Sequence, residues 1–395
     1  MDALFYLTSL AVILAIGILC TLLSEKLKIP NVLLLVLAGI VIGHARYYGD
    51  EIINFSPLFL TCIGTLALVM IIFDSSSRFK LKEFDTFSFR AMKLAIIFLF
   101  LNLIILTIAV ILIFGIKNIF LAMVFSALMA GTAPDVVLTM LRNTSKNRVI
   151  ELLNIESIIN TPLVVLIPFI ILDFLKDYKA ELFLSKFMES VAPFINQFVT
   201  GIGAGILIGI IVFKVMRTQY SESLSPLALI TTALVTYILA ENLKGNGVLA
   251  VTTLGLFFGN IYVKEKESLH EFSYIFANSL EILVFVLVGI MIKIPLDFSF
   301  FAKSVMLFII YLVIRYMAVQ MCFSKLNYSF KEKLFMSLNV PKGIAVTVVV
   351  FILATFEIEG IEPILNLILI FIIYSIVLST IVVKASKNFL EADKA

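Results

Sequence analysis

Gly and Pro interrupt two apolar stretches of this sequence, the first as GTAPD at residues 131–135 and the second as NVPKG at residues 339–343. The prolines of the two breaks lie 207 positions apart, and the apolar stretches that follow them are offset by about the same amount. An ionisable residue stands directly after the proline in each break. A lone break of this kind is explained by a simple helix kink. Two equivalent breaks predict a chain built from two related halves, each with one broken helix.

The helices are expected to break at Gly131 and Pro134 in the first half and at Pro341 and Gly343 in the second half. Pro has no backbone N–H and Gly weakens a helix, so each break frees backbone groups for other partners. In transporters with inverted repeats, broken helices of this kind meet near the membrane midplane and form the substrate site. We therefore expect the functional site where the two breaks meet.

The composition indicates a protein that lies in lipid. Of the 395 residues, 61% are apolar and only 14% are charged, about half the charged fraction of a soluble globular protein. This excludes a soluble enzyme, a disordered chain and a nucleic-acid-binding protein, because a soluble domain cannot hide so much apolar surface from water. The three cysteines lie in apolar runs and the two histidines are isolated, so we expect no disulfide framework, no metal cluster and no cofactor.

Thirteen apolar stretches are candidate transmembrane helices, and nearly all of the chain consists of them and of short loops. They cover residues 3–23, 30–43, 57–74, 94–114, 118–141, 152–173, 190–213, 225–242, 246–263, 272–292, 301–323, 334–355 and 363–383. We therefore expect an all-α polytopic membrane protein, with residues 1–395 forming a single membrane domain and no soluble domain. The first stretch is too long for a signal peptide and lacks a small-residue cleavage site, so it is expected to be retained.

The two halves are expected to be inverted repeats. Spans 1–6 form the first repeat, the span at residues 190–213 is a linker helix, and spans 8–13 within residues 225–383 form the second repeat. Because six spans and one connector precede the second repeat, the halves have opposite orientations in the membrane, and their broken helices cross.

Lys and Arg are distributed unevenly between the loops. Twenty of them lie in one set of alternate loops, whereas seven lie in the other set. Loops rich in Lys and Arg remain on the cytoplasmic side. The protein is therefore expected in the cell membrane with its C-terminus in the cytoplasm and, given thirteen spans, its N-terminus outside.

Five ionisable residues lie deep in the predicted spans: Asp135, Glu156, Glu281, Arg315 and Lys342. A charge at the bilayer centre costs roughly 2.5–3.5 kcal/mol on insertion scales, so each of them needs a partner or a function. Three of the five are acids and two are bases, so two ion pairs would leave one carboxylate without a basic partner. A proton or a metal cation can neutralise such a carboxylate, but not both at once, which is the chemistry of a cation–proton exchanger.

Asp135 is the first candidate for this carboxylate. It would open the second half of the broken helix, where a carboxylate also complements the positive helix N-terminus, so a structural role is the alternative. Asp74, at the cytoplasmic end of the third span, is a second candidate.

Oxygen atoms that suit a hard cation are expected around this position. They come from Thr132 and the carbonyl groups freed near Gly131, and from the sixth span. In that span, Glu156 and Asn160 share one helix face. Ser and Thr also stabilise helix packing in lipid, so for Ser157 a packing role stays open beside ion binding. The expected ligands of Na+ are Asp135, Asp74, Thr132, Ser157, Asn160 and Thr161.

Several motifs point to a known family when they are taken together. They are AENLKGNGVLA at residues 240–250, Phe73-Asp74, Glu156-Ser157-x-x-Asn160, Ser279-Leu280-Glu281, Arg315, and Pro341-Lys342-Gly343 in place of a usual Pro/Leu-Arg-Gly. Over almost the whole chain, the sequence resembles the cation–proton antiporter superfamily, most closely the sodium/proton antiporters of the NhaP and NapA type.

This resemblance implies a homodimer of thirteen-helix chains, in which a core domain with crossed broken helices moves like an elevator against a dimerisation domain. It also implies structural ion pairs. Glu156 would pair with Arg315, Lys342 would compensate the crossed helices and Glu281, and Ser157 would coordinate the ion.

Two motifs depart from the family pattern. The family's Thr-Asp-Pro is Thr132-Ala133-Pro134 in this chain, and its Asn-Asp is Asn160-Thr161. Either Asp135, with help from Asp74, has taken over the carrier role, or the coupling is altered.

The sequence thus predicts a secondary transporter that exchanges Na+ (or Li+ or K+) for H+ by alternating access. The alternative is a K+-selective or uncoupled relative, channel-like or a sensor, that lacks the usual ion-binding aspartates. An intramembrane enzyme is not expected, because no base is paired with a Ser or Cys nucleophile and no His-Glu-x-x-His sequence occurs.

Overall fold

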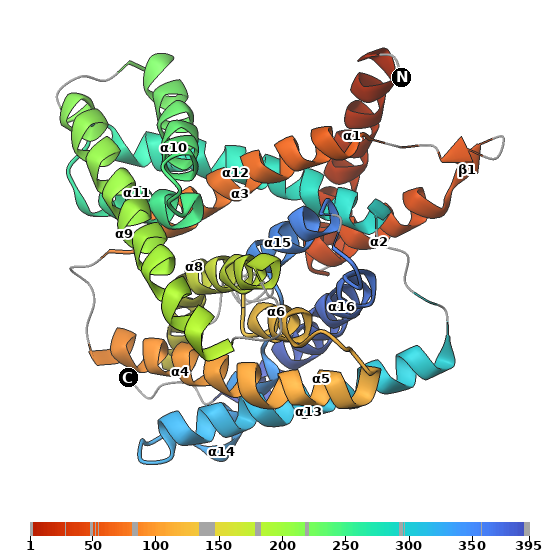
Figure 1. The fold of residues 1–395 in the computed structure, drawn as a ribbon. Coiled ribbons are helices and arrows are strands. Elements are labelled where there is room, and N and C mark those ends of the chain that lie inside the picture. Colours follow the sequence, from red (N-terminus) through yellow and green to blue (C-terminus); the bar gives the residue numbers. More distant parts are fainter. Residues whose placement is uncertain are drawn as a thin grey trace. The chain divides into compact units, whose positions relative to one another are not determined.

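The computed structural model of the protein is almost entirely helical (Figure 1). It describes residues 3–27, 29–47, 50–51, 53, 55–80, 86–133, 147–177, 183–217, 221–291, 295, 297–356 and 358–390. Its helices are α1 (Ala3–Leu27), α2 (Asn31–His44), α3 (Pro57–Ser77), α4 (Thr86–Leu101), the π-helix η2 (Asn102–Leu106), α5 (Thr107–Phe114), α6 (Ile119–Met129), α8 (Arg148–Asp177), α9 (Phe183–Met216), α10 (Leu224–Asn242), α11 (Gly247–Asn260), α12 (Lys266–Met291), α13 (Phe298–Phe323), α14 (Phe330–Leu338), α15 (Ile344–Ala354), α16 (Glu362–Lys384) and the 3-10 helix η4 (Ser386–Asn388).

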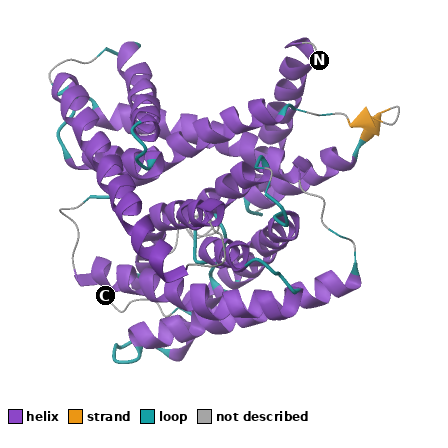
Figure 2. Cartoon of the chain, in the orientation of Figure 1, coloured by secondary structure: helices purple, strands orange, loops and turns teal. Residues whose placement is uncertain are grey.

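A small hairpin departs from the all-α prediction. The strands β1 (Arg46–Tyr47) and β2 (Asp50–Glu51) pair antiparallel. Figure 2 shows strand structure in orange beside the purple helices. Each strand has two residues, so this short pairing between α2 and α3 does not change the helical fold class.

Among the described residues, nine helices are long and apolar enough to cross a membrane, judged by length and composition. Four further apolar helices are shorter, namely α2, α6, α11 and α15. Each predicted apolar stretch overlaps one of these helices, and the predicted class of an all-α polytopic membrane protein is confirmed.

Helical structure ends at the first break, as far as the described residues show, and is interrupted at the second. In the predicted stretch 118–141, α6 ends at Met129 and residues 130–133 are not helical. The predicted stretch 334–355 is divided into α14 and α15 by residues 339–343, which are not helical either. Pro134 and Asp135 lie outside the described residues.

Polar side chains fix where the short helices begin. The Asn118 side chain accepts a hydrogen bond from the Phe120 N–H at the start of α6. At the start of α14, Ser329 and Glu332 form a reciprocal capping box, which satisfies two N–H groups that a helix start leaves free. No side chain caps α15 at Gly343, so α15 begins inside the second break without a local polar side chain.

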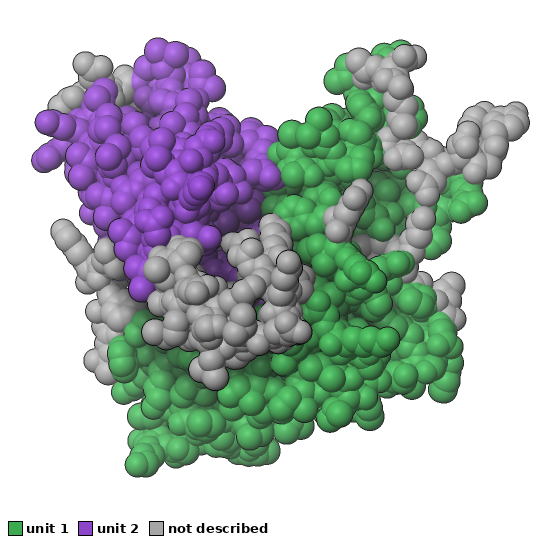
Figure 3. All heavy atoms as spheres, viewed as in Figure 1, with its two compact units in different colours: residues 1–64, 85–160, 282–395 green, residues 65–84, 161–281 purple. Residues whose placement is uncertain are grey.

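The chain divides into two compact units (Figure 3). The first contains residues 1–64, 85–160 and 282–395, and the second contains residues 65–84 and 161–281. Three of the four boundaries fall within helices, namely α3, α8 and α12. The described parts of both breaks belong to the first unit, as do α6, α13 and α16, so the contacts between the breaks lie within a single unit. The predicted division into two repeats stays a prediction.

In the second unit, the motif at residues 240–250 forms a tight connection from α10 to α11. Glu241 accepts a hydrogen bond from the Gly247 N–H at 2.8 Å, and Asn246 caps α11 by accepting from the Leu249 N–H at 2.9 Å. A Cβ atom at Gly201 of α9 would lie only 2.7 Å from the Asn246 carbonyl oxygen. Glycine therefore allows α9, which contains the predicted linker helix, to pack directly against this connection.

Candidate ion-binding site

The two breaks contact each other directly. The Ala133 N–H of the first break donates a hydrogen bond to the Pro341 carbonyl oxygen of the second at 2.8 Å. Gly343 lies so close to Ala133 that a Cβ atom at this glycine would overlap the alanine side chain. Backbone groups in a membrane must be satisfied within the protein, and here one break provides a partner for the other.

Two serines of α16 satisfy other backbone groups of the second break. Ser379 Oγ accepts from the Val340 N–H and Ser375 Oγ accepts from the Lys342 N–H, both at 3.1 Å. Both serines are fully buried. They supply the acceptors that residues 340 and 342 would find within a continuous helix.

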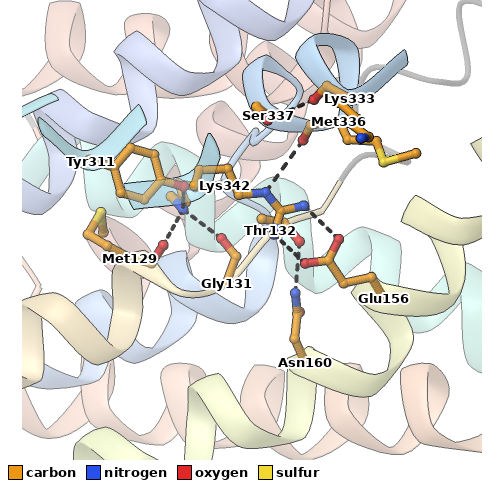
Figure 4. A network of polar contacts seen from close by, with 11 residues as sticks. Met129, Gly131, Thr132, Glu156, Asn160, Tyr311, Lys333, Met336, Ser337 and Lys342 are labelled. Atoms are coloured by element: carbon orange, nitrogen blue, oxygen red, sulfur yellow. Dashed lines mark hydrogen bonds and ion pairs between the residues drawn. The ribbon is translucent and has the colours of Figure 1, made fainter. Parts of the chain in front are cut away.

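Lys342 extends from the second break to the end of α6 (Figure 4). Its ammonium donates to the carbonyl oxygens of Met129 at 2.6 Å and Gly131 at 2.7 Å, and to the Tyr311 hydroxyl at 2.6 Å. The side chain is 0% exposed. All three acceptors are neutral, and they use the three N–H groups of the ammonium. The contacts to the end of α6 agree with the expectation that Lys342 compensates the crossed helices, and its compensation of Glu281 stays a prediction. Glu281, the expected partner, belongs to the second unit.

Glu156 of α8 and Arg315 of α13 form the ion pair that the resemblance implies. Two parallel hydrogen bonds join them, from Nη1 to Oε1 at 2.5 Å and from Nη2 to Oε2 at 2.7 Å. Both side chains are 0% exposed. The guanidinium also lies 4.7 Å from the centre of the Phe98 ring and donates from Nε to the Met336 carbonyl oxygen at 3.4 Å. This bidentate pair joins α8 to α13 and neutralises two of the five deep charges.

Thr132 and Asn160 are in contact, as their predicted place in one site requires. The Asn160 amide donates to Thr132 Oγ1 at 2.8 Å, and both residues are buried. Asn160 is one helical turn after Glu156 on α8. The first break is therefore bound to α8 one helical turn from the buried ion pair.

The four remaining predicted ligands do not all belong to the unit that contains the described parts of the breaks. Ser157 is half-buried and follows Glu156 on α8, whereas Thr161 is the first residue of α8 that belongs to the second unit. Asp74 also belongs to the second unit, at the end of α3, where its Oδ2 accepts from Arg78 Nη2 at 2.6 Å. One oxygen of Asp74 is thus already paired with a base. Asp135, the first candidate, lies outside the described residues.

Three residues of this cluster were not predicted from the sequence, namely Tyr311, Ser375 and Ser379. Spacing alone could have pointed to them. Tyr311 precedes the deep Arg315 by four positions on one helix, and the two serines are four positions apart in a mainly apolar helix, so each pair shares a helix face. The carbonyl groups of Met129 and Gly131 carry no side-chain signal of this kind.

Comparison with known proteins places these features in a family. A family model described as the transmembrane sodium/hydrogen exchanger matches residues 11–386. The K(+)/H(+) antiporter NhaP2 of Shewanella sp. (strain ANA-3) is 27% identical over 271 residues, which are 66% of this chain and 44% of the relative. This chain thus spans less than half of that relative's length. The probable Na(+)/H(+) antiporter 2 of Methanocaldococcus jannaschii is 25% identical over 311 residues, which are 75% of this chain and 71% of the relative.

A solved structure has the same fold. The sodium proton antiporter MjNhaP1 from Methanocaldococcus jannaschii, solved at pH 8, aligns with 97% of this chain and 99% of its own chain. The TM-score is 0.79 at 20% sequence identity. The family prediction made from the motifs is confirmed by the matched model, which covers most of the chain. The chain belongs to the transmembrane sodium/hydrogen exchanger family.

Proposed function

We propose that this chain exchanges a monovalent cation for a proton across the membrane by alternating access. The observation that carries the proposal is the direct contact between the two breaks, from the Ala133 N–H to the Pro341 carbonyl oxygen. In transporters with inverted repeats, the substrate site lies where broken helices meet. The names of the matched relatives, which include Na+/H+ and K+/H+ antiporters, support the same activity.

The cation would be held by oxygen atoms around the first break. Thr132 and Asn160 are already joined by a hydrogen bond, and the carbonyl groups of Met129 and Gly131 point to a cation, the ammonium of Lys342. Ser157 and Thr161 follow on α8 and would complete the set. Hard cations prefer such oxygen ligands, and Na+, K+ and Li+ are the candidates.

Asp135 would carry the proton. Glu156 and Arg315 neutralise each other, and Asp74 is paired with Arg78. Asp135 directly follows the first break in the sequence, so it is the deep acid best placed to exchange a proton for a cation at that break.

The family and the charge distribution support a proposal for the wider assembly. We expect a multi-pass protein of the cell membrane, with the C-terminus in the cytoplasm and the N-terminus outside. We also expect a homodimer in which a core domain moves between inward-open and outward-open states, each selected by the occupancy of the site.

The test is cation-driven proton movement in proteoliposomes with an imposed pH gradient, followed with an internal pH-sensitive dye. Adding Na+, K+ or Li+ should collapse the gradient, and Asp135→Asn should abolish this effect, because an amide cannot release a proton. If none of the three cations moves protons through the wild-type protein, exchange is not its function. If Asp135→Asn retains coupled exchange, the carrier role belongs to another acid.

One observation favours a second candidate, a K+-selective or uncoupled pathway. The positions of the two family aspartates are taken by Ala133 and Thr161. Such a protein would pass K+ current through a reconstituted bilayer without proton movement, whereas an electroneutral exchanger would show proton movement without current.

A further inference from the structure

The ammonium group of Lys342 has the surroundings of a bound monovalent cation. Its Nζ lies 2.6 Å from the Met129 carbonyl oxygen, 2.7 Å from the Gly131 carbonyl oxygen and 2.6 Å from Tyr311 Oη. All three ligands are neutral oxygens, and Lys342 and Tyr311 are both 0% exposed. Figure 4 shows the three contacts converging on one nitrogen.

The features that hold this ammonium would hold a free cation equally well. Met129 ends α6, and carbonyl groups at a helix C-terminus carry a partial negative charge. Carbonyl oxygens of interrupted helices coordinate alkali ions in transporters and channels. The centre of the Tyr311 ring lies 4.5 Å from Nζ, which adds a cation–π attraction. None of these attractions requires that the cation be covalently attached to the chain.

Lys342 is also suited to leave this position. Its charge rests on a flexible four-carbon stem, in contrast to the rigid fork of an arginine. Arg315, the other buried base of the site, is bound to a carboxylate by two hydrogen bonds. The acceptors of Lys342 are neutral, so its withdrawal would leave no buried anion without a partner.

We propose that Met129 O, Gly131 O and Tyr311 Oη form a monovalent-cation site of ammonium size, which Lys342 fills in this structure and leaves when the transported cation binds. The proposal rests on the proposed function, since it names ligands of the same site. K+ and NH4+ are close to each other in size, whereas Na+ and Li+ are smaller and need shorter contacts. The site should therefore prefer K+ and NH4+ over Na+ and Li+.

The first test is cation binding to purified Lys342→Ala by isothermal titration with the chlorides of K+, NH4+, Na+ and Li+, choline being the balancing cation. In this variant no lysine ammonium competes for the three oxygens. The site should therefore bind K+ and NH4+ more tightly than the wild type does, by a factor on the order of ten, because the wild-type site is open to a free cation for only a fraction of the time. The gain should be smaller for Na+ and Li+.

Lys266→Ala is the matched control, because the Lys266 ammonium also donates to two carbonyl oxygens, Gly259 O at 2.6 Å and Ile261 O at 2.9 Å. It belongs to the second unit, and its removal should leave cation affinity unchanged. Adding Tyr311→Phe to Lys342→Ala removes one proposed ligand and keeps the ring, so most of the gain should disappear. If Lys342 is only a fixed cap on α6, Lys342→Ala binds no cation more tightly than the wild type does, and the proposal fails.

A second variant keeps the proposal testable if Lys342→Ala does not fold. Tyr311→Phe in the otherwise intact chain should change the ratio of the KM values for K+ and Na+ in the proteoliposome assay. An unchanged ratio would overturn Tyr311 Oη as a ligand. The titration measures binding and does not depend on transport. A wild-type protein that moves no protons would therefore overturn the proposed function, whereas the cation site would still be judged by the titration alone.

Discussion

At the scale of single residues, the site holds its two buried bases in different ways. Arg315 is bound to the carboxylate of Glu156 by two hydrogen bonds, and both groups are 0% exposed. Lys342 is bound by neutral oxygens alone. Removing one partner of a fully buried ion pair leaves an uncompensated charge, whereas a base bound by neutral groups can be exchanged for another cation without that penalty. The Glu156–Arg315 pair therefore stabilises the contact between α8 and α13, and Lys342 is the group that we propose a cation to displace.

The first prediction concerns the ion pair between Glu156 and Arg315. Glu156→Gln should destabilise the protein by about 3–5 kcal/mol, because it leaves the Arg315 guanidinium buried without an anion. Thermal unfolding in detergent measures the loss as a lowered melting temperature.

Glu332→Gln is the matched control for this change. Its partner Arg148 has a side chain that is 43% exposed and lies at 3.3 Å, so this ion pair is worth about 0–1 kcal/mol. Gln also retains the capping box with Ser329. Equal melting temperatures for the two variants would contradict the bracing role of Glu156.

At the scale of elements, the second break depends on α16. Residues 340 and 342 donate their N–H groups to Ser379 and Ser375, each at 3.1 Å. Ser375→Ala or Ser379→Ala should each cost about 1–3 kcal/mol, because a buried N–H loses its acceptor. Hydrogen–deuterium exchange of a peptide that contains residues 339–343 should become faster in each variant.

Thr380→Ala is the control within the same helix. Thr380 Oγ1 donates to the Ile376 carbonyl oxygen of its own helix at 2.6 Å, so its removal should leave exchange at residues 339–343 unchanged. Slower or unaltered exchange in both serine variants would show that α16 does not hold the break.

The interrupted helices could be predicted from the sequence, but their contacts could not. Gly and Pro mark both breaks, because they change the backbone itself. The pairing of Glu156 with Arg315 followed from the family motifs. The acceptors of Lys342 stayed hidden, since two of them are backbone carbonyls that every residue possesses and the third is one tyrosine in an apolar helix. The sequence therefore predicted that Lys342 compensates the broken helices, but it did not identify the oxygens that bind its ammonium.

At the scale of the whole molecule, the distribution of Lys and Arg between the loops predicts the orientation in the membrane. Lys387 belongs to the Lys- and Arg-rich set of loops and Lys244 to the other set. In a background without the native cysteines, Lys387→Cys should react with an impermeant thiol reagent only from the cytoplasmic side, and Lys244→Cys only from outside. Labelling of both from one side would contradict the predicted topology.

The most direct test of the central claim, that the transported cation binds where the two breaks meet, is an anomalous diffraction map of crystals soaked in Rb+ or Tl+, under conditions in which that ion drives proton movement in proteoliposomes. We predict a peak within coordination distance of at least one oxygen among Met129 O, Gly131 O and Thr132 Oγ1, with the Lys342 ammonium moved away from it. A peak confined to another part of the protein, such as the surroundings of Asp74, with Lys342 still bound to its three oxygens, would contradict the account.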